Sequence, residues 1–479
     1  MAIGQRERRI YRIEHYPEEV IATAIAKSSR SSDPFDKTLE DLNDAKAAQF
    51  HEKWVVGYGH ASVAEHAILR MAFEAVTRLA ADKIEGNRLA SYTEKSTRYQ
   101  KWGARDYHTP QSVTKSKYAS EYEDAHTKLL QTYAAILVVV GEEIKRRYPA
   151  REGESDEKHD GRVRTTYVDR CRFMLPASAL ADLGMTANAR TWEYAINKWL
   201  SSSLTEVREI GEVAKEQALL VVPTLVKYAK SSNFIVEKQS KLDNLNNGIE
   251  SHPTENKPGV KLFDIDQSGE DKVLAALLYQ ARGSEDLDEC MRDVGQMTRE
   301  QKINLLDNFY GGMSIFDKLG KEFELANFTF DVTLDWASYR DFWRNRMLTQ
   351  IAQPMTGNLE FAIPKIIDEV GMGDKVSDAL QGAIDLANVM KSWSQNDEYQ
   401  YLYPNATLRR ELMHFNLREF AEFWRIRGAA NTNPAYRILA LRMGEIVAEK
   451  YPILWNYVKS KGEVPTSVEV NEEFYGTDS

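Results

Sequence analysis

Two short polar segments near the start of the chain hold residue types that could bind a phosphate or a cofactor. The first is GHASVAEH (59–66), with His60, Ser62 and Glu65. The second is NRLASYTEKSTRY (87–99), in which short hydroxyl side chains alternate with two arginines. A guanidinium group supplies forked donors that match a phosphate, and hydroxyl and backbone N–H groups can complete the site. These segments therefore indicate a ligand that carries a phosphate or a ribose.

Each segment also allows a simpler interpretation. Ser62 and Glu65 have the S-x-x-E spacing of a capping box, which marks the start of a helix, and a helix start can itself cradle phosphates. The two histidines of the first segment could bind a metal. However, the sequence has no CxxC pair and no HExxH motif, so we predict no metal site. The second segment could equally be a solvated loop.

The order of these segments recurs in the second half of the chain, which indicates two copies of one unit. FHEKWVVGYGH, AEHAILRMAFEAV and GNRLASYTEKSTRY are matched there by INLLDNFYGG, FELANFTFDVTL and RDFWRNRMLTQ. Equivalent residue pairs are Glu65 with Glu324, Arg88 with Arg346, Asn188 with Asn416, and Arg172 with Gln400. The offset falls from 259 to 228 residues along these pairs, so we expect an insertion in the first copy within 101–165. That stretch includes 142–164, a charged run typical of an exposed loop.

The elements that must position these residues follow from apolar spacing. Helix-like spacing occurs over 119–148, 203–230, 375–393 and 435–459. FTFDVTL (328–334) alternates as a half-buried strand does, and RMAFEAVTRL (70–79) is its counterpart in the first copy. Each copy thus mixes a small sheet with several helices, which predicts an α+β fold.

A polar segment rich in Asn, Ser, Lys and Pro separates the two copies. It has no sustained apolar period, as is typical of a linker. We therefore predict a first domain over 1–230, a linker over 231–260 and a second domain over 261–479. The length of 479 residues agrees, because a single core rarely grows that large.

The composition is that of a soluble globular protein without a long nucleic-acid interface. The formal net charge is -10, whereas such an interface needs a basic stripe. The two cysteines, Cys171 and Cys290, form no CxxC pair, which favours a reducing, cytoplasmic compartment. No stretch approaches the roughly 20 apolar residues of a membrane span. We expect neither nucleic acid nor a membrane as a partner.

Taken together, the motifs resemble one enzyme family. Residues 88–99 stand as R-x-x-S-x-x-E-x-S-x-R-Y, which resembles the signature R-H-R-x-x-S-x-N-E-x-S-x-R-Y of the flavin-dependent thymidylate synthases (the ThyX family). That family also has a G-H-x-S/T-x-x-E-H block, matched by 59–66, then R-x-x-L-P, matched by 172–176, and N-x-R, matched by Asn188 and Arg190. The resemblance covers nearly all of both copies. It implies two tandem thymidylate-synthase-complementing-type domains, each a small sheet with a helical bundle.

The two copies depart from the family pattern in nearly complementary places. The first has lost the leading arginines of the family's R-Q and R-H-R, and Lys198 or Trp199 stands where the family has a later arginine. The second has lost the GH block and the serine–arginine loop, but keeps Arg340, Arg344, Asn345, Arg346, Asn416, Arg418 and Arg427. Family sites lie between subunits of a homotetramer, so we expect one composite site built from both copies. Two independently degenerate copies are the alternative.

The resemblance implies a role for each matched residue. In the family, NADPH reduces FAD, and a one-carbon unit passes from methylenetetrahydrofolate to C5 of dUMP without a cysteine nucleophile. Arg427 and Arg344 would be catalytic, because they would stabilise negative charge on the uracil ring, although Arg427 could instead be an ordinary exposed helix arginine. Substrate-binding residues would be Glu94, Ser96, Arg98, Arg172, Arg340 and Asp341. Cofactor-binding residues would be His60, Ser62, Glu65, Asn188, Arg190, Asn345, Arg346, Asn416 and Arg418.

One substitution bears on the substrate. The family's Gln between its two leading arginines is Asp341 here, and a carboxylate only accepts hydrogen bonds, whereas an amide also donates them. A related C5 methyl- or hydroxymethyltransferase acting on dCMP or a hypermodification precursor is therefore an alternative to a thymidylate synthase. A non-catalytic nucleotide- or flavin-binding paralogue is a third possibility. The resemblance further implies a homodimer that mimics the family tetramer.

Overall fold

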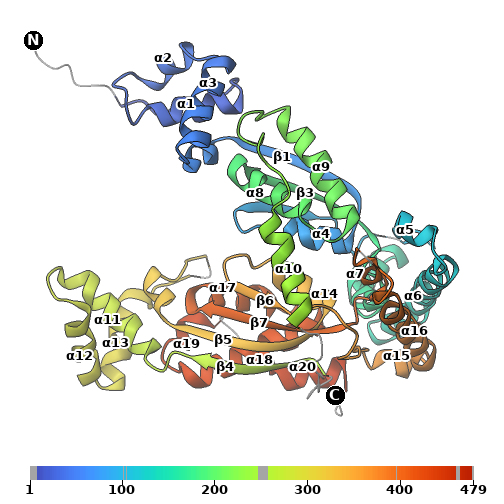
Figure 1. Ribbon diagram of the computed structural model, residues 1–479. Helices are drawn as coiled ribbons and strands as arrows, with labels where there is room; N and C mark the ends of the chain where they lie inside the picture. The colour runs from blue at the N-terminus through green and yellow to red at the C-terminus, as the bar shows by residue number, and fades with distance from the viewer. Residues whose placement is uncertain are drawn as a thin grey trace, which may run out of the picture. The chain divides into compact units, whose positions relative to one another are not determined.

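The computed structural model describes residues 8–100, 102–103, 105–245, 257–314, 316–394, 396–459 and 464–476 (Figure 1). They form two compact units. The first unit contains the chain up to Lys95 and from Leu180 through helix α10 (Asn233–Leu245). The second contains Ser96–Ala179 and the chain from residue 257 onward. A central segment of the first sequence copy therefore belongs to the same compact unit as the second copy.

The first unit is built on a three-stranded antiparallel sheet in the order β1-β3-β2. The strands are β1 (Ile68–Thr77), β2 (Ala90–Glu94) and β3 (Leu180–Asn188). Its remaining elements are α1 (Glu18–Lys27), α2 (Phe35–Glu40), α3 (Asp44–His51), η1 (Glu52–Gly57), η2 (Ala61–His66), α4 (Arg78–Glu85), α8 (Ala189–Leu200) and α9 (Thr205–Leu219). Trp192 and Trp199 of α8 are buried and pack on Phe73 of β1. This contact fixes α8 against the sheet.

The second unit is built on a four-stranded antiparallel sheet in the order β4-β5-β7-β6. The strands are β4 (Gly259–Ile265), β5 (Asn327–Asp335), β6 (Thr349–Ala352) and β7 (Leu408–Asn416). Helices contributed by the first copy are α5 (Gln111–Thr114), α6 (Ala119–Arg147), α7 (Asp156–Asp169) and η3 (Arg172–Met174). Those of the second copy are α11 (Gly269–Arg282), α12 (Leu287–Gln296), α13 (Arg299–Tyr310), η4 (Lys321–Leu325), α14 (Trp336–Trp343), α15 (Ile366–Glu369), α16 (Gly373–Lys391), η5 (Glu398–Leu402), α17 (Leu417–Arg427), α18 (Pro434–Lys450), α19 (Trp455–Val458) and α20 (Ser467–Phe474).

The two sheets share one topology and one register, which confirms the α+β prediction and the tandem arrangement. The order β1-β3-β2 of the first copy recurs as β5-β7-β6 in the second, to which β4 is added. The terminal ladder pair of the first sheet is Ile68 with Asn188, and that of the second is Asn327 with Asn416. These pairs are equivalent at the offsets found in the sequence. The predicted strand over 328–334 lies within β5, and the one over 70–79 covers most of β1 but runs two residues past its end into α4.

Segments of the two copies meet in the second unit around a local two-fold relationship. Pro176 forms a β-bridge with Pro404, its equivalent in the other copy. The flanking backbone bonds are reciprocal: Ala177 N–H donates to Tyr403 (2.9 Å), Asn405 N–H to Leu175 (2.9 Å), Ser178 N–H to Tyr401 (3.1 Å) and Ala406 N–H to Phe173 (2.9 Å). A contact in which each half offers the same surface is the geometry of a symmetric dimer interface. Here that interface lies within one chain.

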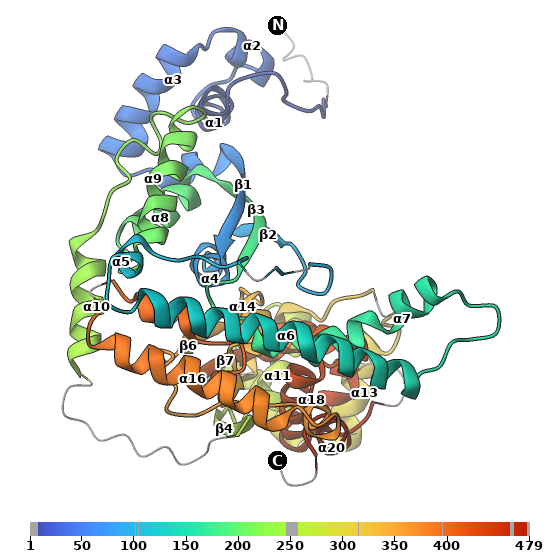
Figure 2. The same cartoon turned by 90° about the vertical axis from the view of Figure 1, so that its right-hand side faces the viewer.

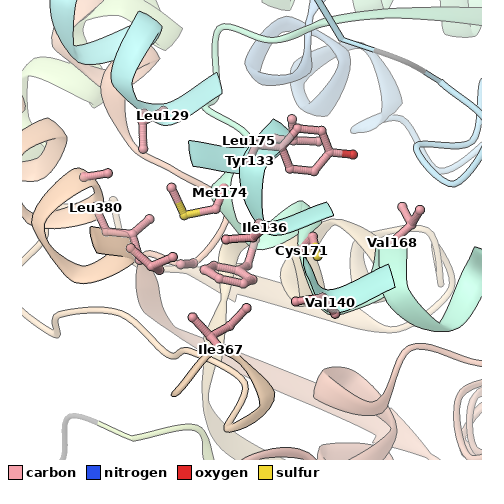
Figure 3. Close-up of a cluster of buried hydrophobic side chains, with 14 of the residues drawn as sticks. Leu129, Tyr133, Ile136, Val140, Val168, Cys171, Met174, Leu175, Ile367 and Leu380 are labelled. Atoms are coloured by element: carbon pink, nitrogen blue, oxygen red, sulfur yellow. The ribbon is translucent and has the colours of Figure 1, made fainter. Parts of the chain in front are cut away.

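A hydrophobic core joins the two copies next to this contact. Helix α6 of the first copy lies along α16 of the second (Figure 2). Leu129 and Ile136 of α6 and Leu380 of α16 are fully buried in one cluster (Figure 3). Each such side chain contributes about 1.5–3 kcal/mol when it is removed from water. The site described below is therefore held by apolar packing between the copies.

Three sequence-based expectations about secondary structure, over 142–164, 203–230 and 435–459, are wrong in detail. The run 142–164, expected to be an exposed loop, is largely helical: α6 extends to Arg147 and α7 begins at Asp156. Helix α7 forms because Ser155 caps it and because Val163 and Tyr167 give it a buried face. The expected linker over 231–260 contains α10 and the start of β4, and its residues 246–256 lie outside the described residues. The predicted helix over 203–230 ends at Leu219, and the one over 435–459 is interrupted after Lys450.

Within the described residues, none of the helices has the length and apolar character needed to cross a membrane.

Candidate active site

The second unit contains a cluster of arginines that comes from both sequence copies. Arg98 follows β2 and Arg172 begins η3, so both belong to the first copy. Arg344 caps the C-terminal end of α14 and Arg427 ends α17, so both belong to the second. The site called here the arginine cluster consists of these four residues with Asp169 and Asp341.

Asp341 lies among three of these arginines. Its Oδ2 is 3.6 Å from Arg172, and its Oδ1 is 4.0 Å from both Arg344 and Arg427. The side chain of Asp341 is 19% exposed and that of Arg427 is 13% exposed. A ligand from solvent can therefore reach the carboxylate, and Arg427 is not the ordinary exposed helix arginine that the sequence left as an alternative.

Asp169 organises the first-copy side of the cluster. It accepts two hydrogen bonds from Arg98, from Nε at 3.0 Å and from Nη2 at 2.6 Å, and lies 3.3 Å from Arg172 Nε. Arg172 also donates to the Thr97 hydroxyl at 2.8 Å. A fork of two parallel bonds fixes the plane of a guanidinium group as well as its position. Sequence reasoning missed Asp169, although its place three residues before Arg172, one helical turn away, is a signal that could have identified it.

The two aspartates of the cluster favour the charged forms of Arg98 and Arg172. The hydrogen bonds that Arg98 donates to Asp169 raise the pKa of Arg98 above its ordinary value. Burial opposes the charged form of Arg172, but Asp169 and Asp341 outweigh it, so the pKa of Arg172 is also raised. The buried Nε of Arg427 has no hydrogen-bond partner within the described part of the chain. A buried donor of this kind is a natural point of contact for an anionic or carbonyl oxygen of a ligand.

Tyr436 of α18 is a second residue that the sequence did not single out. It is 5% exposed, and its ring centroid lies 5.7 Å from Cζ of Arg427. Burial, with the nearby Asp341 carboxylate, raises the pKa of Tyr436, so its phenol is neutral at pH 7. It forms an aromatic wall beside Arg427. No spacing rule in the sequence marked this position.

The other predicted substrate-binding residues lie in three different settings. Ser96 is exposed, and its hydroxyl accepts from the backbone N–H of Arg98 at 3.3 Å. Arg340 is 2% exposed, with Cζ 5.6 Å from the Trp336 ring centroid. Glu94 belongs to the first unit, where its buried side chain lies 3.7 Å from Arg78. Glu94 is thus not part of the arginine cluster. Within the described residues, the hydrogen bond given for Ser96 is to the Arg98 backbone and not to a carboxylate of the cluster.

Three of the residues predicted to bind the cofactor line a small pocket in the first unit. His60, Ser62 and Glu65 share a cavity of about 330 Å³ with the rings of Phe50 and Trp54. His60 directly precedes helix η2, which carries Ser62 and Glu65, begins at Ala61 and has no side-chain cap. The capping-box interpretation is therefore wrong, because the segment forms a short, tight 3-10 helix that leaves Ser62 inside it.

The second copy has a larger cleft at the equivalent place. A cavity of about 1100 Å³ is lined by Glu324, Asn416 and Arg418 among others. Arg418 pairs with Glu324 at 2.7 Å, as Arg190 pairs with Glu65 at 2.5 Å in the first copy. The ion pair has therefore been kept in both copies, although the GH block has been lost from the second.

The remaining predicted cofactor residues have structural partners. Asn188 and Asn416 are the N-caps of α8 and α17, where their side chains accept from backbone N–H groups at 2.9 Å and 2.8 Å. Asn345 donates to the Phe342 carbonyl at 3.0 Å, and Arg346 is half-buried between α14 and β6. The capping role explains the two asparagines without a ligand, so their proposed contact with a cofactor stays a prediction.

In the first copy, Lys198 and Trp199 stand at the place where the second copy has Arg427, and both bond to the end of a neighbouring helix. Lys198 donates to the Gly86 carbonyl at 2.9 Å, and the Trp199 indole donates to the Lys83 carbonyl at 3.2 Å. Both bonds satisfy carbonyl groups at the C-terminal end of α4, which a helix leaves without partners. Burial, followed by the nearby Lys83, lowers the pKa of Lys198 to about 8. In the first copy, the C-terminal end of α4 is thus covered by Lys198 and Trp199. At the C-terminal end of α14, the equivalent helix of the second copy, Arg344 takes the corresponding position.

Comparison with known proteins agrees with the sequence resemblance. The family model described as "Thymidylate synthase complementing protein" matches residues 11–224 and 263–453. A UPF0159 protein of Chlamydia muridarum is 27% identical, over 94% of this chain and 91% of its own length. A flavin-dependent thymidylate synthase of Thermococcus onnurineus is 26% identical over 39% of this chain and 69% of its own length. Among solved structures, a UMP/dUMP methylase from Streptomyces cacaoi bound with 5-Br dUMP aligns with a TM-score of 0.36 and 16% identity, covering 42% of this chain and 95% of that one.

Proposed function

Because the chain belongs to the thymidylate synthase complementing protein family, we propose that it is a flavin-dependent methyltransferase acting at C5 of a pyrimidine nucleotide. In the fullest form of the proposal, the substrate is dUMP, the carbon donor is methylenetetrahydrofolate, the reductant is NADPH and the cofactor is FAD. One observation carries the proposal above all. Arg98 and Arg172 of the first copy meet Arg344 and Arg427 of the second around Asp169 and Asp341, within one compact unit.

The charge of the cluster suits a nucleoside monophosphate. Its four guanidinium groups exceed its two carboxylates by two positive charges, and a phosphate monoester carries about -1.5 to -2 at pH 7. Arg98 and Arg172 would hold this phosphate, since Asp169 has already fixed their orientation. The phosphate would thus be bound by groups that need little reorganisation.

The ring-side residues would provide the electrostatic activation. Adding carbon at C5 without a covalent nucleophile requires that negative charge on the pyrimidine ring be stabilised. Arg427, with its buried Nε, and Arg344 beside it are the donors on that side. Cys171 and Cys290 are both buried, and burial raises the pKa of each thiol. Neither thiol is poised to act as a thiolate nucleophile.

The residues predicted to hold FAD fit a large, partly polar cofactor. The second-copy cleft of about 1100 Å³ offers Arg418 and the amide of Asn416, and the first-copy pocket offers His60 and Ser62. Bound FAD would supply the reducing equivalents for the one-carbon transfer. The side chains of this chain would orient it and keep water from the ring-side arginines.

A single complete site in each chain follows from the asymmetry of the copies. Lys198 and Trp199 occupy the first copy's ring-side position with helix-end contacts. A homodimer would therefore carry two complete sites where a family tetramer carries four. This assembly remains part of the proposal.

The same site leaves one specific alternative substrate. Asp341 replaces an amide that the family places between its leading arginines, so the site could instead serve a C5 methyl- or hydroxymethyltransferase for another pyrimidine nucleotide, such as dCMP. Release of the C5 hydrogen from labelled dUMP and dCMP, with FAD, methylenetetrahydrofolate and NADPH present, distinguishes these substrates. Release from dUMP supports the main proposal, and release from dCMP alone supports the alternative. Release from neither would leave a non-catalytic binding protein as the better account.

A further inference from the structure

Helix α20 lies beyond the part of the chain that the family model matches, since that match ends at residue 453. A capping box formed by Thr466 and Glu469 begins the helix. The helix packs on α18 (Figure 2), where Ser467 donates to the Glu445 carboxylate from its backbone N–H at 2.6 Å and from its hydroxyl at 2.8 Å. Helix α20 is therefore attached to the second copy but stands outside the family unit.

The C-terminal end of α20 contacts a residue of the first copy, Arg170. Phe474 is 3% exposed, and its ring centroid lies 5.7 Å from Cζ of Arg170. Arg170 Nη2 also donates to the Glu473 carboxylate at 3.4 Å. Lys365 of the second copy holds the same helix end, because its backbone N–H donates to the Phe474 carbonyl at 3.0 Å and its Nζ to the Glu472 carbonyl at 2.6 Å. The end of α20 thus connects the two copies.

Arg170 stands within the phosphate side of the arginine cluster. It directly follows Asp169, which accepts both bonds of Arg98 and lies 3.3 Å from Arg172 Nε. Arg170 is buried and also donates to the Thr166 carbonyl at 3.0 Å within α7. A side chain held at both ends leaves the adjoining backbone little freedom to move. The contacts of Arg170 therefore help to fix Asp169, and through it both phosphate-side arginines.

Glu473 also lies near the ring side of the cluster. Burial lowers the pKa of Arg437, and the Glu473 carboxylate opposes this effect because it favours the charged form. Arg437 Nε donates to the Gly428 carbonyl at 3.0 Å, and Gly428 directly follows Arg427 at the end of α17. One helix end thus adjoins the backbone that carries Asp169 and the backbone that carries Arg427.

We propose that Phe474 and Glu473 are positioning residues, through which α20 keeps the arginine cluster in the geometry that binds a nucleotide phosphate. They act through Arg170 and Arg437 and do not contact the nucleotide themselves. The side chain of Glu473 is 64% exposed, and an ion pair with so exposed a carboxylate contributes little. The buried ring of Phe474 is therefore the main contact. This inference rests on the proposed function, because nucleotide binding is its readout.

The test measures the binding of dUMP to the full-length protein by isothermal titration calorimetry. Phe474→Ala should raise the Kd about tenfold, because a small displacement of charged donors has an effect of that size. Phe474→Tyr keeps an aromatic ring over Arg170 and should stay within about twofold of the wild type, whereas Glu473→Gln should raise the Kd about two- to threefold. Glu472→Gln is the matched control on the same helix, since Glu472 holds Lys365 through its backbone carbonyl. It should leave the Kd unchanged.

A second control separates positioning from general stability. Leu277→Ala removes a buried side chain of α11 in the same unit, and it should lower the Tm while leaving the Kd unchanged. If Phe474→Ala behaves in the same way, α20 only stabilises the fold and this inference is wrong. If circular dichroism shows that Phe474→Ala is unfolded, Phe474→Leu takes its place, because it keeps an apolar side chain without the ring, and an unchanged Kd in that variant is the contrary result.

The wild-type protein distinguishes a failure of this inference from a failure of the proposed function. If UMP or dCMP binds and dUMP does not, the same comparison is made with the nucleotide that binds. If none of the three binds, the proposed function fails and this inference fails with it. If one binds and the Phe474 variants bind it equally well, only this inference fails.

Discussion

Arg172, from the first copy of the repeat, lies 3.6 Å from Asp341, from the second. The two residues are 169 positions apart in the chain, and they meet because residues 96–179 fold into the same compact unit as the second copy. The local two-fold contact at Pro176 and Pro404 places Arg172 at that boundary. Residues that the family resemblance assigns to different copies therefore lie in one cluster of side chains.

The composite site predicts that single changes in either copy strongly lower kcat/KM for the nucleotide. Arg98→Ala in the first copy and Arg344→Ala in the second should each lower kcat/KM by about 100-fold or more, because each removes a charged donor aimed at the substrate. Steady-state release of the C5 hydrogen measures this effect. Arg146→Ala is the matched control, since Arg146 pairs with Glu143 at 2.7 Å on the exposed face of α6. An unchanged kcat/KM in either the Arg98 or the Arg344 variant would contradict a composite site.

Asp169 should act through Arg98 rather than on the substrate. Asp169→Asn removes one charged acceptor of the bidentate pair and should raise KM for the nucleotide about tenfold while changing kcat little, because phosphate binding contributes to ground and transition states alike. The same change should lower the free energy of unfolding by about 1.5–3 kcal/mol. Kinetics at saturating nucleotide and urea denaturation measure the two effects. A fall in kcat with KM unchanged would instead place Asp169 in the chemical step.

Acid should destabilise the second unit through His126. Burial lowers the pKa of His126 to about 4, against an ordinary value of 6.5, and its ring is bonded to the Ser178 hydroxyl at 2.6 Å. The unfolded chain takes up a proton on the His126 ring more readily than the folded chain does. The contribution of neutral His126 to the free energy of unfolding is therefore complete above pH 6.5 and is lost as the pH falls toward 4. The loss should be about 3 kcal/mol. Urea denaturation across this range should show a flatter profile for His126→Gln, and an identical profile in both proteins would refute the assignment.

The proposed homodimer predicts a defined mass in solution. Each chain has a mass of 54.7 kDa, so sedimentation equilibrium should give about twice that value if two chains replace four single-copy subunits. The measurement needs no ligand. A strictly monomeric protein at micromolar concentration would rule out this assembly while leaving the intramolecular site intact.

Much of the fold follows from sequence patterns, and the reasons are local. Residues 328–334 alternate because one face of β5 is buried, and the long helices show apolar spacing because each packs along one side. The charged run that became α7 was misjudged because its few buried residues, Val163 and Tyr167 among them, are diluted by surface charge. Local spacing cannot reveal a helix whose stability comes mainly from tertiary contacts.

Most candidate residues of the site could be predicted from the sequence, but which of them lie together in the folded chain could not. The motif around Arg98 and the spacing of Arg344 and Arg427 identified candidates, but no pattern in one copy states which segment of the other will face it. Asp169 and Tyr436 were not predicted because neither belongs to a sequence motif. Their connection with the site comes from contacts with Arg98 and Arg427 that only the folded chain forms. The asparagines at 188 and 416 show the reverse, since each matches the family motif and also has a plain capping role.

The meeting of Pro176 with Pro404 has a consequence for behaviour at low abundance. Separate subunits lose a shared site on dilution, because their association depends on concentration. Two segments of one polypeptide instead face each other at an effective local concentration that does not change with the number of molecules in the cell. A composite site built on this contact would stay assembled even at a few copies per cell, and neither half could be exchanged for a mismatched partner.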